Sequence, residues 1–273
     1  MMSEPYIIMS APNGARRQKT DHPELPLTPQ EMAICAEEIL SAGASILHLH
    51  VRDDNGGHSL DVDRYKTSIK AVKDIVGSRL IIQATTESVG IYTREQQIDM
   101  VRKLKPEAVS LALRELCPSE EHLSEFSEFI KWLKAEHIFP QYILYDDADF
   151  TRFEIYRKKG VFQCDDPFSL LVLGSYQGKS EENDKAIKLL KENSLNATFP
   201  WAVCGFAKNE KECVSHSVLN NGHIRVGFEN NIWRDNKTKL ENNAEMIHFS
   251  AKVAGEHNRP LATSFDVRNK FNL

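Results

Sequence analysis

Two histidines separated by one residue are the feature of the sequence with the clearest chemical meaning. His48 and His50 lie in residues 45–53, which read Ser-Ile-Leu-His-Leu-His-Val-Arg-Asp. Because apolar residues alternate there without helical spacing, we predict a buried strand, on which side chains two apart share one face. Two imidazoles on one rigid strand are typical of a metal site with room for a third ligand. Two ordinary core or surface histidines are the alternative.

A carboxylate on a later segment is the candidate for the third ligand. Residues 223–229 read His-Ile-Arg-Val-Gly-Phe-Glu, so Arg225 and Glu229 are predicted to share one face of a strand. Two imidazoles and one carboxylate would leave a zinc ion an open position for a substrate. The alternative for Glu229 is an acid that caps a helix or lies at the surface.

Hydroxyl side chains are predicted at the ends of two other strands. Thr85 and Thr86 follow one apolar run, and Ser110 lies near the end of the next. Hydroxyls in these positions could bind a substrate carboxylate. They could equally well satisfy backbone groups of the adjoining loops.

The elements that must position these residues alternate regularly along the chain. Strands are predicted at residues 6–10, 45–53, 79–86, 108–113, 141–145, 168–174, 198–205 and 223–228. Helices are predicted at residues 28–43, 63–76, 93–104, 120–136, 149–159, 180–192, 209–219 and 240–256. Eight strand–helix repeats predict an α/β fold, a (β/α)8 TIM barrel formed as a single domain by residues 1–273, with the active site at the C-terminal ends of the strands. A doubly wound open sheet is the alternative.

Composition narrows the class of partner. The chain has 273 residues and a formal net charge of −5, with charges of both signs interspersed, so we expect neither nucleic-acid nor membrane binding but a small-molecule partner. Its five cysteines include no Cys-x-x-Cys pair, which argues against a disulfide framework or a cysteine zinc site and favours the reducing cytoplasm. We see neither a signal peptide nor an apolar run as long as a membrane span.

Taken together, six segments resemble the β-keto acid cleavage enzymes, the family of 3-keto-5-aminohexanoate cleavage enzyme. They are residues 11–16 (APNGAR), 48–53 (HLHVRD), 82–86 (IQATT), 201–205 (WAVCG), 222–229 (GHIRVGFE) and 259–263 (RPLAT). The paired histidines and the Arg-x-Gly-x-Glu segment are the most specific of these.

The resemblance implies a zinc-dependent barrel that exchanges acyl groups between a β-keto acid and acetyl-CoA, giving acetoacetate and a new acyl-CoA. By the same resemblance, His48, His50 and Glu229 would hold the Zn2+, and Thr85 and Ser110 would contact the substrate. A β-keto acid can chelate zinc through its keto and carboxylate oxygens, and Arg225 would place a positive charge close by. The resemblance further implies a homotetramer.

The sequence departs from the family pattern in four places. Asn230 stands where the family usually has an aspartate that pairs with the arginine in proton abstraction. The residues after the strand-three threonines are Glu87 and Ser88 instead of glycines, Ile143 replaces an acid on strand five, and residues 112–115 replace an Asn-rich turn. Because an amide has no basicity near neutral pH, we predict Glu87 as the base and a merely orienting role for Asn230.

An unusually long irregular segment, residues 11–27, is expected to contribute to substrate binding. We predict that Asn13, Arg16 and Ser88 contact the substrate together with the strand-end hydroxyls. The guanidinium of Arg16 would repel an amine tail and attract a carboxylate, unless it turns to solvent or to the phosphates of CoA.

Two other functions fit the same residues. One is a metal-dependent aldolase or hydrolase on the same barrel, which needs no CoA. The other is a catalytically impaired, metal-binding barrel that serves as a ligand-binding or regulatory protein, and the loss of the aspartate at Asn230 favours it.

Overall fold

Eight parallel strands form a closed barrel in the computed structural model, which describes residues 4–174, 192, 194, 197–235 and 237–273. The barrel strands are β1 (Ile8–Ser10), β2 (Ile46–Leu49), β5 (Ile81–Thr85), β6 (Ala108–Ala112), β7 (Phe139–Leu144), β8 (Phe168–Leu173), β9 (Trp201–Gly205) and β10 (His223–Val226). Each pairs with its neighbours in parallel, and β10 closes the ring against β1. The predicted TIM barrel is confirmed, and the alternative of an open sheet is wrong.

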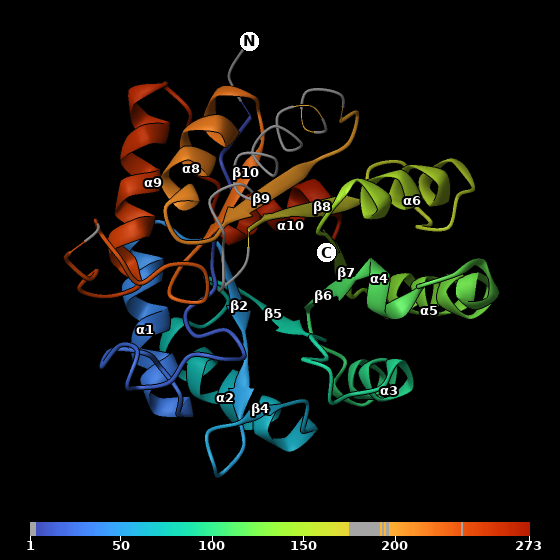
Figure 1. Cartoon of the computed structure of the whole chain (residues 1–273), viewed down its shortest axis with the longest axis horizontal. Coiled ribbons are helices and arrows are strands. Elements are labelled where there is room, and N and C mark those ends of the chain that lie inside the picture. The colour runs from blue at the N-terminus through green and yellow to red at the C-terminus, as the bar shows by residue number, and fades with distance from the viewer. Residues whose placement is uncertain (1–3, 175–191, 193, 195–196, 236) are drawn as a thin grey trace.

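Helices surround the strands on the outside of the barrel (Figure 1). They are α1 (Pro29–Ala42), α2 (Val62–Val76), α3 (Arg94–Leu104), α4 (Leu113–Leu116), the 3-10 turn η1 (Glu120–His122), α5 (Leu123–Ala135), α6 (Asp147–Lys158), α8 (Asn209–Leu219), α9 (Ala244–Glu256) and α10 (Ser264–Phe271). Most of the helix predicted at residues 180–192 lies outside the described residues. Among the described residues, no helix has both the length and the apolar character that crossing a membrane requires.

The two faces of each strand supply two separate apolar cores. On β2, for example, Ile46 belongs to the cluster inside the barrel, whereas Leu47 and Leu49 pack with the helices outside it. Because strand side chains alternate, His48 shares the inward face with Ile46. The same alternation turns Arg225 of β10 inward, since its neighbours on the strand belong to the outer core.

Local signals in the sequence explain where α1 begins and ends. Thr28 caps the helix by accepting a hydrogen bond from the N–H of Glu31, whose side chain returns to the N–H of Thr28, and Pro29 occupies the first turn. Gly43 ends the helix in a left-handed conformation with φ of 113°. These local contacts set both ends of α1, close to the bounds of 28 and 43 predicted for this helix.

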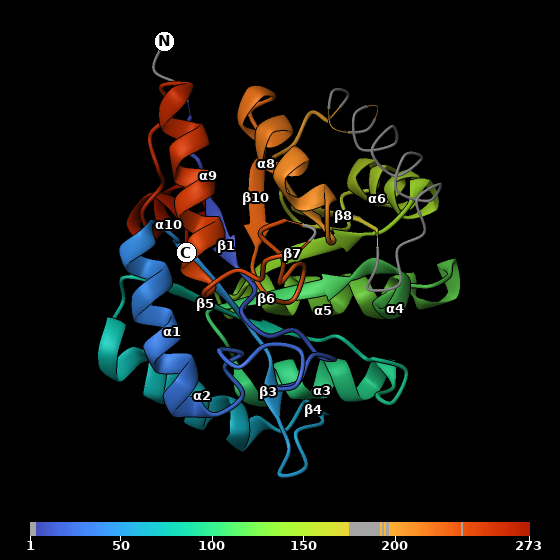
Figure 2. The same ribbon diagram turned by 60° about the vertical axis from the view of Figure 1, so that its left-hand side comes forward.

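Most of the barrel strands are shorter in the structure than predicted, and the ends of two of them bear on the site. The segment at 45–53 leaves the barrel after Leu49, and β3 (Val51–Arg52) pairs antiparallel with β4 (His58–Ser59). Figure 2 shows this hairpin extending beyond the barrel wall. The strand predicted at 223–228 ends at Val226, because Gly227 adopts φ of +135° and turns the chain.

An unpredicted helix closes the opposite end of the barrel from the predicted site. The ring of Phe271, at the end of α10, lies 4.4 Å from the ring of Phe139 and 5.0 Å from that of Phe168. Since both rings belong to strand starts, α10 seals the N-terminal end with apolar contacts. The polar end of the barrel is therefore the C-terminal one, as the fold requires of an active site.

Candidate active site

The structure brings His48, His50 and Glu229 together at the C-terminal end of the barrel. The Nε2 atoms of the two histidines lie 3.1 Å apart, and Glu229 Oε2 lies 3.7 Å from His48 Nε2 and 3.5 Å from His50 Nε2. All three side chains are buried. Each offers one ligand atom to a common point, with those atoms within 4.8 Å of one another.

Glutamine side chains orient the first histidine. His48 Nδ1 lies 2.7 Å from Gln83 Oε1, so the ring donates its Nδ1 proton and leaves the Nε2 lone pair directed at Glu229 and His50. Gln83 Nε2 in turn donates to Gln141 Oε1 at 3.1 Å. A histidine whose second nitrogen is held in this way is typical of a metal ligand.

The protonation states of these residues suit a divalent cation. Burial lowers the pKa of His48 to about 4 and that of His50 to about 3, so both rings are neutral near pH 7. Burial opposes ionisation of Glu229, but Arg225 and the two imidazoles hold its pKa below the ordinary value. Glu229 Oε2 has no hydrogen-bond partner among the described residues, although it is buried. Neutral imidazoles and an unpaired carboxylate oxygen are the donors that zinc binds, so these residues fit the predicted metal.

Arg225 lies beside this cluster and is buried. Its Nη2 donates to Glu229 Oε1 at 3.2 Å, to Asn230 Oδ1 at 3.4 Å and to Cys204 Sγ at 3.3 Å. Asn230 also donates from Nδ2 to the carbonyl oxygen of Arg225 at 2.9 Å. The amide of Asn230 therefore faces the arginine, where it can orient the guanidinium but cannot accept a proton from a substrate carbon.

A cavity of about 330 Å³ opens from this cluster to the surface. Of the predicted site residues, those that line it are Arg16, His48, Thr85, Thr86, Glu87, Ser88, Arg225 and Glu229. Those that do not line it are Asn13, His50, Ser110 and Asn230.

Glu87 carries the carboxylate nearest to the histidines apart from Glu229. Its Oε2 lies 3.9 Å from His50 Nε2, and the side chain is 24% exposed. Burial raises the pKa of Glu87 to about 7, and the negative charge of Glu229 adds to the rise. A carboxyl group with such a pKa can exchange a proton near neutral pH.

The strand-end hydroxyls differ in what they contact. Thr86 Oγ1 donates to the carbonyl oxygen of Ser110 at 2.9 Å, which agrees with the alternative that this hydroxyl satisfies a backbone group. Thr85 Oγ1 accepts from the N–H of Glu87 at 3.0 Å and keeps its own proton for another acceptor. Ser88 Oγ donates to Glu115 Oε1 at 3.0 Å. Of the predicted threonine and serine contacts, Thr85 and Ser88 thus line the cavity without donating their hydroxyl proton to a described backbone oxygen.

Asn13 and Ser110 are buried behind the cavity. Asn13 Nδ2 donates to the carbonyl oxygens of Pro26 and His50, so its amide ties the long loop to the histidine segment. The hydroxyl of Ser110 has no hydrogen-bond partner among the described residues. Neither side chain lines the cavity, and their predicted substrate contacts remain predictions.

Three polar residues that line the cavity, Arg114, Glu115 and Tyr145, were not among the predicted site residues. The Arg114 guanidinium packs over the ring of Tyr145, 4.6 Å from its centroid, and forms ion pairs with Asp146 and Asp149. Glu115 accepts from both the N–H and the hydroxyl of Ser88, and burial raises its pKa. The available signal was the departure from the Asn-rich turn at residues 112–115 and the position of Tyr145 at the end of a predicted strand.

A third histidine near the cluster was also missed. The ring of His58, on β4, lies 5.3 Å from the ring of His50, and its Nε2 lies 2.7 Å from the carbonyl oxygen of Glu87. His58 therefore joins the β3–β4 hairpin to the loop that carries Glu87. No spacing signal could have found it, because the hairpin that returns it to the site was not predicted.

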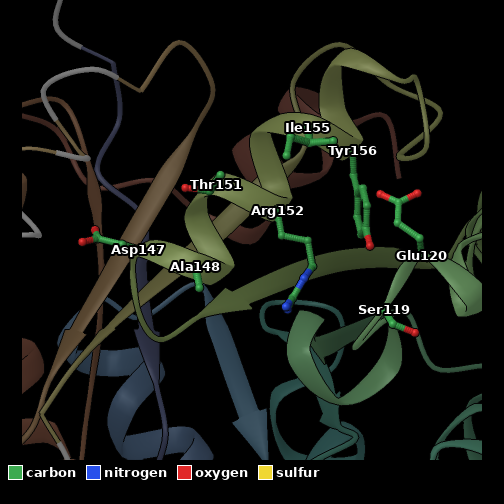
Figure 3. A pocket seen from close by; sticks show the side chains of 8 residues that line it. All are labelled: Ser119, Glu120, Asp147, Ala148, Thr151, Arg152, Ile155 and Tyr156. Carbon is green, nitrogen blue, oxygen red and sulfur yellow. The ribbon is translucent and has the colours of Figure 1, made fainter.

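A second hollow, of about 560 Å³, lies away from the cluster between α6 and η1 (Figure 3). It is lined by Ser119, Glu120, Asp147, Ala148, Thr151, Arg152, Ile155 and Tyr156. Arg152 and Tyr156 project from α6 toward the segment with Ser119 and Glu120 (Figure 3). None of the predicted site residues lines it.

Comparison with known proteins agrees with this geometry. The sequence model of the beta-keto acid cleavage enzyme family matches residues 5–273. A protein of Acetoanaerobium sticklandii named 3-keto-5-aminohexanoate cleavage enzyme is 28% identical over 272 residues, which cover 97% of each chain. A protein of Cupriavidus necator named 3-oxoadipate:acetyl-CoA acetyltransferase is 24% identical over 278 residues, covering 100% of this chain and 96% of that one.

A solved structure shares the fold. ObcA, described in a ternary complex with a C4-CoA adduct and oxalate, superposes with a TM-score of 0.72 at 17% identity. The match covers 92% of this chain and 68% of that chain. At this identity the likeness concerns the barrel alone.

Proposed function

Because this chain belongs to the beta-keto acid cleavage enzyme family and is an enzyme of that type, we propose that it exchanges acyl groups between a β-keto acid and acetyl-CoA. In this reaction R–CO–CH2–COO⁻ and acetyl-CoA give acetoacetate and R–CO–S–CoA. The printed name of the Cupriavidus necator relative, an acetyl-CoA acetyltransferase, supports the choice of co-substrate.

The observation that carries the proposal is the cluster of His48, His50 and Glu229 at the cavity that Glu87 and Arg225 also line. We propose that the first three residues hold one Zn2+. When bound there, the metal supplies a Lewis acid for the keto and carboxylate oxygens of the substrate. The two histidines are neutral near pH 7 and need lose no proton to bind it.

Glu87 is the proposed base. Its carboxylate would take a proton from the carbon between the keto and carboxylate groups, because Asn230 in the position of the usual aspartate is not basic. The resulting carbanion attacks the thioester carbon of acetyl-CoA and displaces CoA thiolate, which then attacks the original keto carbon. The bond between that carbon and the former CH2 breaks, and Glu87 returns its proton to the acetoacetate carbanion, so that acetoacetate and the new acyl-CoA are released.

Fixed charges in the cavity would orient the substrate. The Arg225 guanidinium lies against Glu229 and stabilises negative charge that develops beside it. The Thr85 hydroxyl and the Ser88 segment are the proposed contacts for substrate oxygens. Arg16 also lines the cavity, and we propose that it disfavours an ammonium group on the substrate tail.

The test is a screen of the purified protein with acetyl-CoA and a panel of β-keto acids whose tails are neutral, anionic or cationic. Mass spectrometry of the CoA esters should show a new acyl-CoA together with an equal amount of acetoacetate. Substrate loss that does not consume acetyl-CoA would indicate the aldolase or hydrolase instead. Metal binding without turnover of any member would favour the impaired barrel, and a preference for 3-keto-5-aminohexanoate would contradict the role of Arg16.

A further inference from the structure

A buried acid supports the turn that carries Glu229 from the side away from the cavity. Residues 227–231 form this turn, and the N–H groups of its last two residues donate to the carbonyl oxygen of Gly227 at 2.8 and 3.0 Å. Glu210, in the first turn of α8, is fully buried against it. The reaction described above makes no use of this carboxylate.

Both oxygens of Glu210 accept hydrogen bonds from the turn. Oε1 accepts from the N–H of Gly227 at 3.1 Å, and Oε2 accepts from Asn231 Nδ2 at 3.1 Å. The orientation of the Asn231 amide is determined independently. Its Nδ2 donates to the carbonyl oxygen of Trp233 at 2.7 Å, and its Oδ1 accepts from the N–H of Trp233 at 2.9 Å.

The contacts require an acceptor at both ends of the side chain at position 210. Both oxygens of a carboxyl group can accept a hydrogen bond, whether the group is ionised or carries a proton, whereas a glutamine would direct its NH2 group at one of the two donors. If that glutamine rotates, its NH2 group faces the other donor instead. The Asn231 amide cannot flip without losing its two hydrogen bonds to the backbone of Trp233. An unsatisfied buried donor pair is costly, so the turn would move to relieve it.

We propose that Glu210 is a positioning residue for Glu229, holding the turn in the conformation that directs Glu229 at His48 and His50. The backbone supports this division of roles. The N–H of Glu229 donates to the carbonyl oxygen of Ala11 at 3.0 Å on one side of the turn, while Glu210 holds the other side. The inference rests on the proposed function of the three residues as metal ligands.

The test measures metal affinity directly. Metal-free protein is titrated with Co2+, whose visible absorption reports the ligands, and Zn2+ affinity is obtained by competition. Glu210→Gln should bind both ions about 10- to 100-fold more weakly and change the Co2+ absorption band, the usual effect of losing a partner that orients a ligand. Glu212→Gln, which removes the same charge from an exposed position on the same helix turn, is the matched control and should bind like the wild type.

A polarity swap separates positioning from general stability. In the double variant Glu210→Gln/Asn231→Asp, the glutamine NH2 donates to the new carboxylate while its oxygen still accepts from Gly227, but the hydrogen bond from position 231 to the carbonyl oxygen of Trp233 is lost. We expect this variant to recover part of the metal affinity that Glu210→Gln loses and to shift the absorption band back toward that of the wild type. If Glu210→Gln alone does not fold, the metal affinity of the double variant is compared with that of the wild type instead.

Three outcomes would overturn the inference. Wild-type affinity in Glu210→Gln, even with a lower thermal midpoint of the metal-free protein, would show that Glu210 serves only stability. A folded double variant that binds as weakly as Glu210→Gln would refute the hydrogen-bond account. Absence of metal binding by the wild type would refute the metal site itself, and with it the proposed function, which the first two outcomes leave intact.

Discussion

At the scale of single residues, the chemistry depends on which carboxylate can take a proton. Glu229 accepts a hydrogen bond from Arg225 and faces the two histidines, so its carboxylate is not the proposed base. Asn230 is an amide whose oxygen faces Arg225. Glu87 is the carboxylate that we assign as the base, because it lines the cavity and its pKa is raised to about 7 by burial and by the charge of Glu229.

Exchanging Glu87 or Asn230 tests this assignment. We expect Glu87→Gln to lower kcat by about 10²- to 10⁴-fold, the usual cost of losing a positioned base. If the wild type is nearly inert instead, Asn230→Asp should raise its turnover by restoring a carboxylate beside Arg225. Steady-state kinetics of acyl-CoA formation provide the measurement. A fast wild type whose rate changes less than a few-fold in both variants would contradict the account of proton transfer, even with the metal in place.

Glu210 makes the stability of the metal-free protein depend on pH. Burial raises its pKa from 4.5 to about 8, although Gly227, Asn231, Arg17 and Lys211 all act in the opposite direction. A group whose folded pKa is raised binds more protons in the folded than in the unfolded state between those values, so stability falls as pH rises through that range. Relative to Glu210→Gln, the wild-type free energy of unfolding should fall by up to about 1.4 kcal/mol per pH unit.

Urea unfolding of both proteins between pH 5 and pH 8 checks this prediction. Glu212→Gln should follow the wild-type curve because its side chain is exposed. Parallel curves for the wild type and Glu210→Gln would show that the buried acid does not titrate in this range.

At the scale of elements, the end of β10 decides where Glu229 lies. A strand continued through residue 229 would place Glu229 beyond the barrel rim, along the direction of β10. Gly227 instead turns the chain with φ of +135°, and its missing side chain lets the carbonyl oxygen of Ala11 approach. That carbonyl then accepts the N–H of Glu229. One glycine thus connects β1, β10 and the proposed metal site.

Replacing Gly227 by alanine should damage both the fold and the site. An added Cβ would lie 2.5 Å from Ala11 O, and the backbone conformation is strained for any residue with a side chain. We expect a loss of about 2 kcal/mol or more in the free energy of unfolding, together with weaker metal binding. Gly160→Ala is the matched control, because φ is +71° there and nothing lies within 4 Å of the added atom. Equal losses in the two variants would mean that the contact with Ala11 is unimportant.

At the scale of the whole molecule, the proposed metal joins distant parts of the chain. His48 lies on β2, the second barrel strand in chain order, whereas Glu229 follows β10, the last one. A ligand that binds only the folded state stabilises it, by about 2.7 kcal/mol at 100 times its dissociation constant. Metal should therefore stabilise the entire barrel and not one loop.

Metal content and thermal unfolding test this coupling. Protein purified without a histidine tag should contain about one zinc per chain, and a chelator should lower its thermal midpoint. The double variant His48→Ala/His50→Ala should contain none and should not respond to the chelator. Metal retained by that variant would refute the site.

The assembly and the extent of the domain remain predictions of the sequence analysis. A homotetramer is expected from the family resemblance, and light scattering coupled to size-exclusion chromatography measures it. That residues 1–273 fold as one domain is expected from the uninterrupted strand–helix repeat.

The sequence by itself determined the barrel and most of the candidate cluster. Apolar alternation and helix caps are local signals, because hydrogen-bonded turns and strand faces depend on neighbouring residues. Hence eight strands were predicted with ends displaced by a few residues, and the shared face of His48 and His50 was predicted from spacing alone. Residues such as Tyr145 and Arg114 carried no comparable local pattern.

Only the tertiary structure decided how Glu229 reaches the histidines. Strand parity predicted the right neighbours for the wrong reason, since β10 ends at Val226 and a turn held by Ala11 and Glu210 brings the carboxylate inward. Those contacts join residues more than 200 positions apart or lie on different helices and strands, and no local spacing encodes them. The same holds for the hydrogen bond from the Asn13 amide to the carbonyl oxygen of His50, which the position of Asn13 in a long loop did not predict.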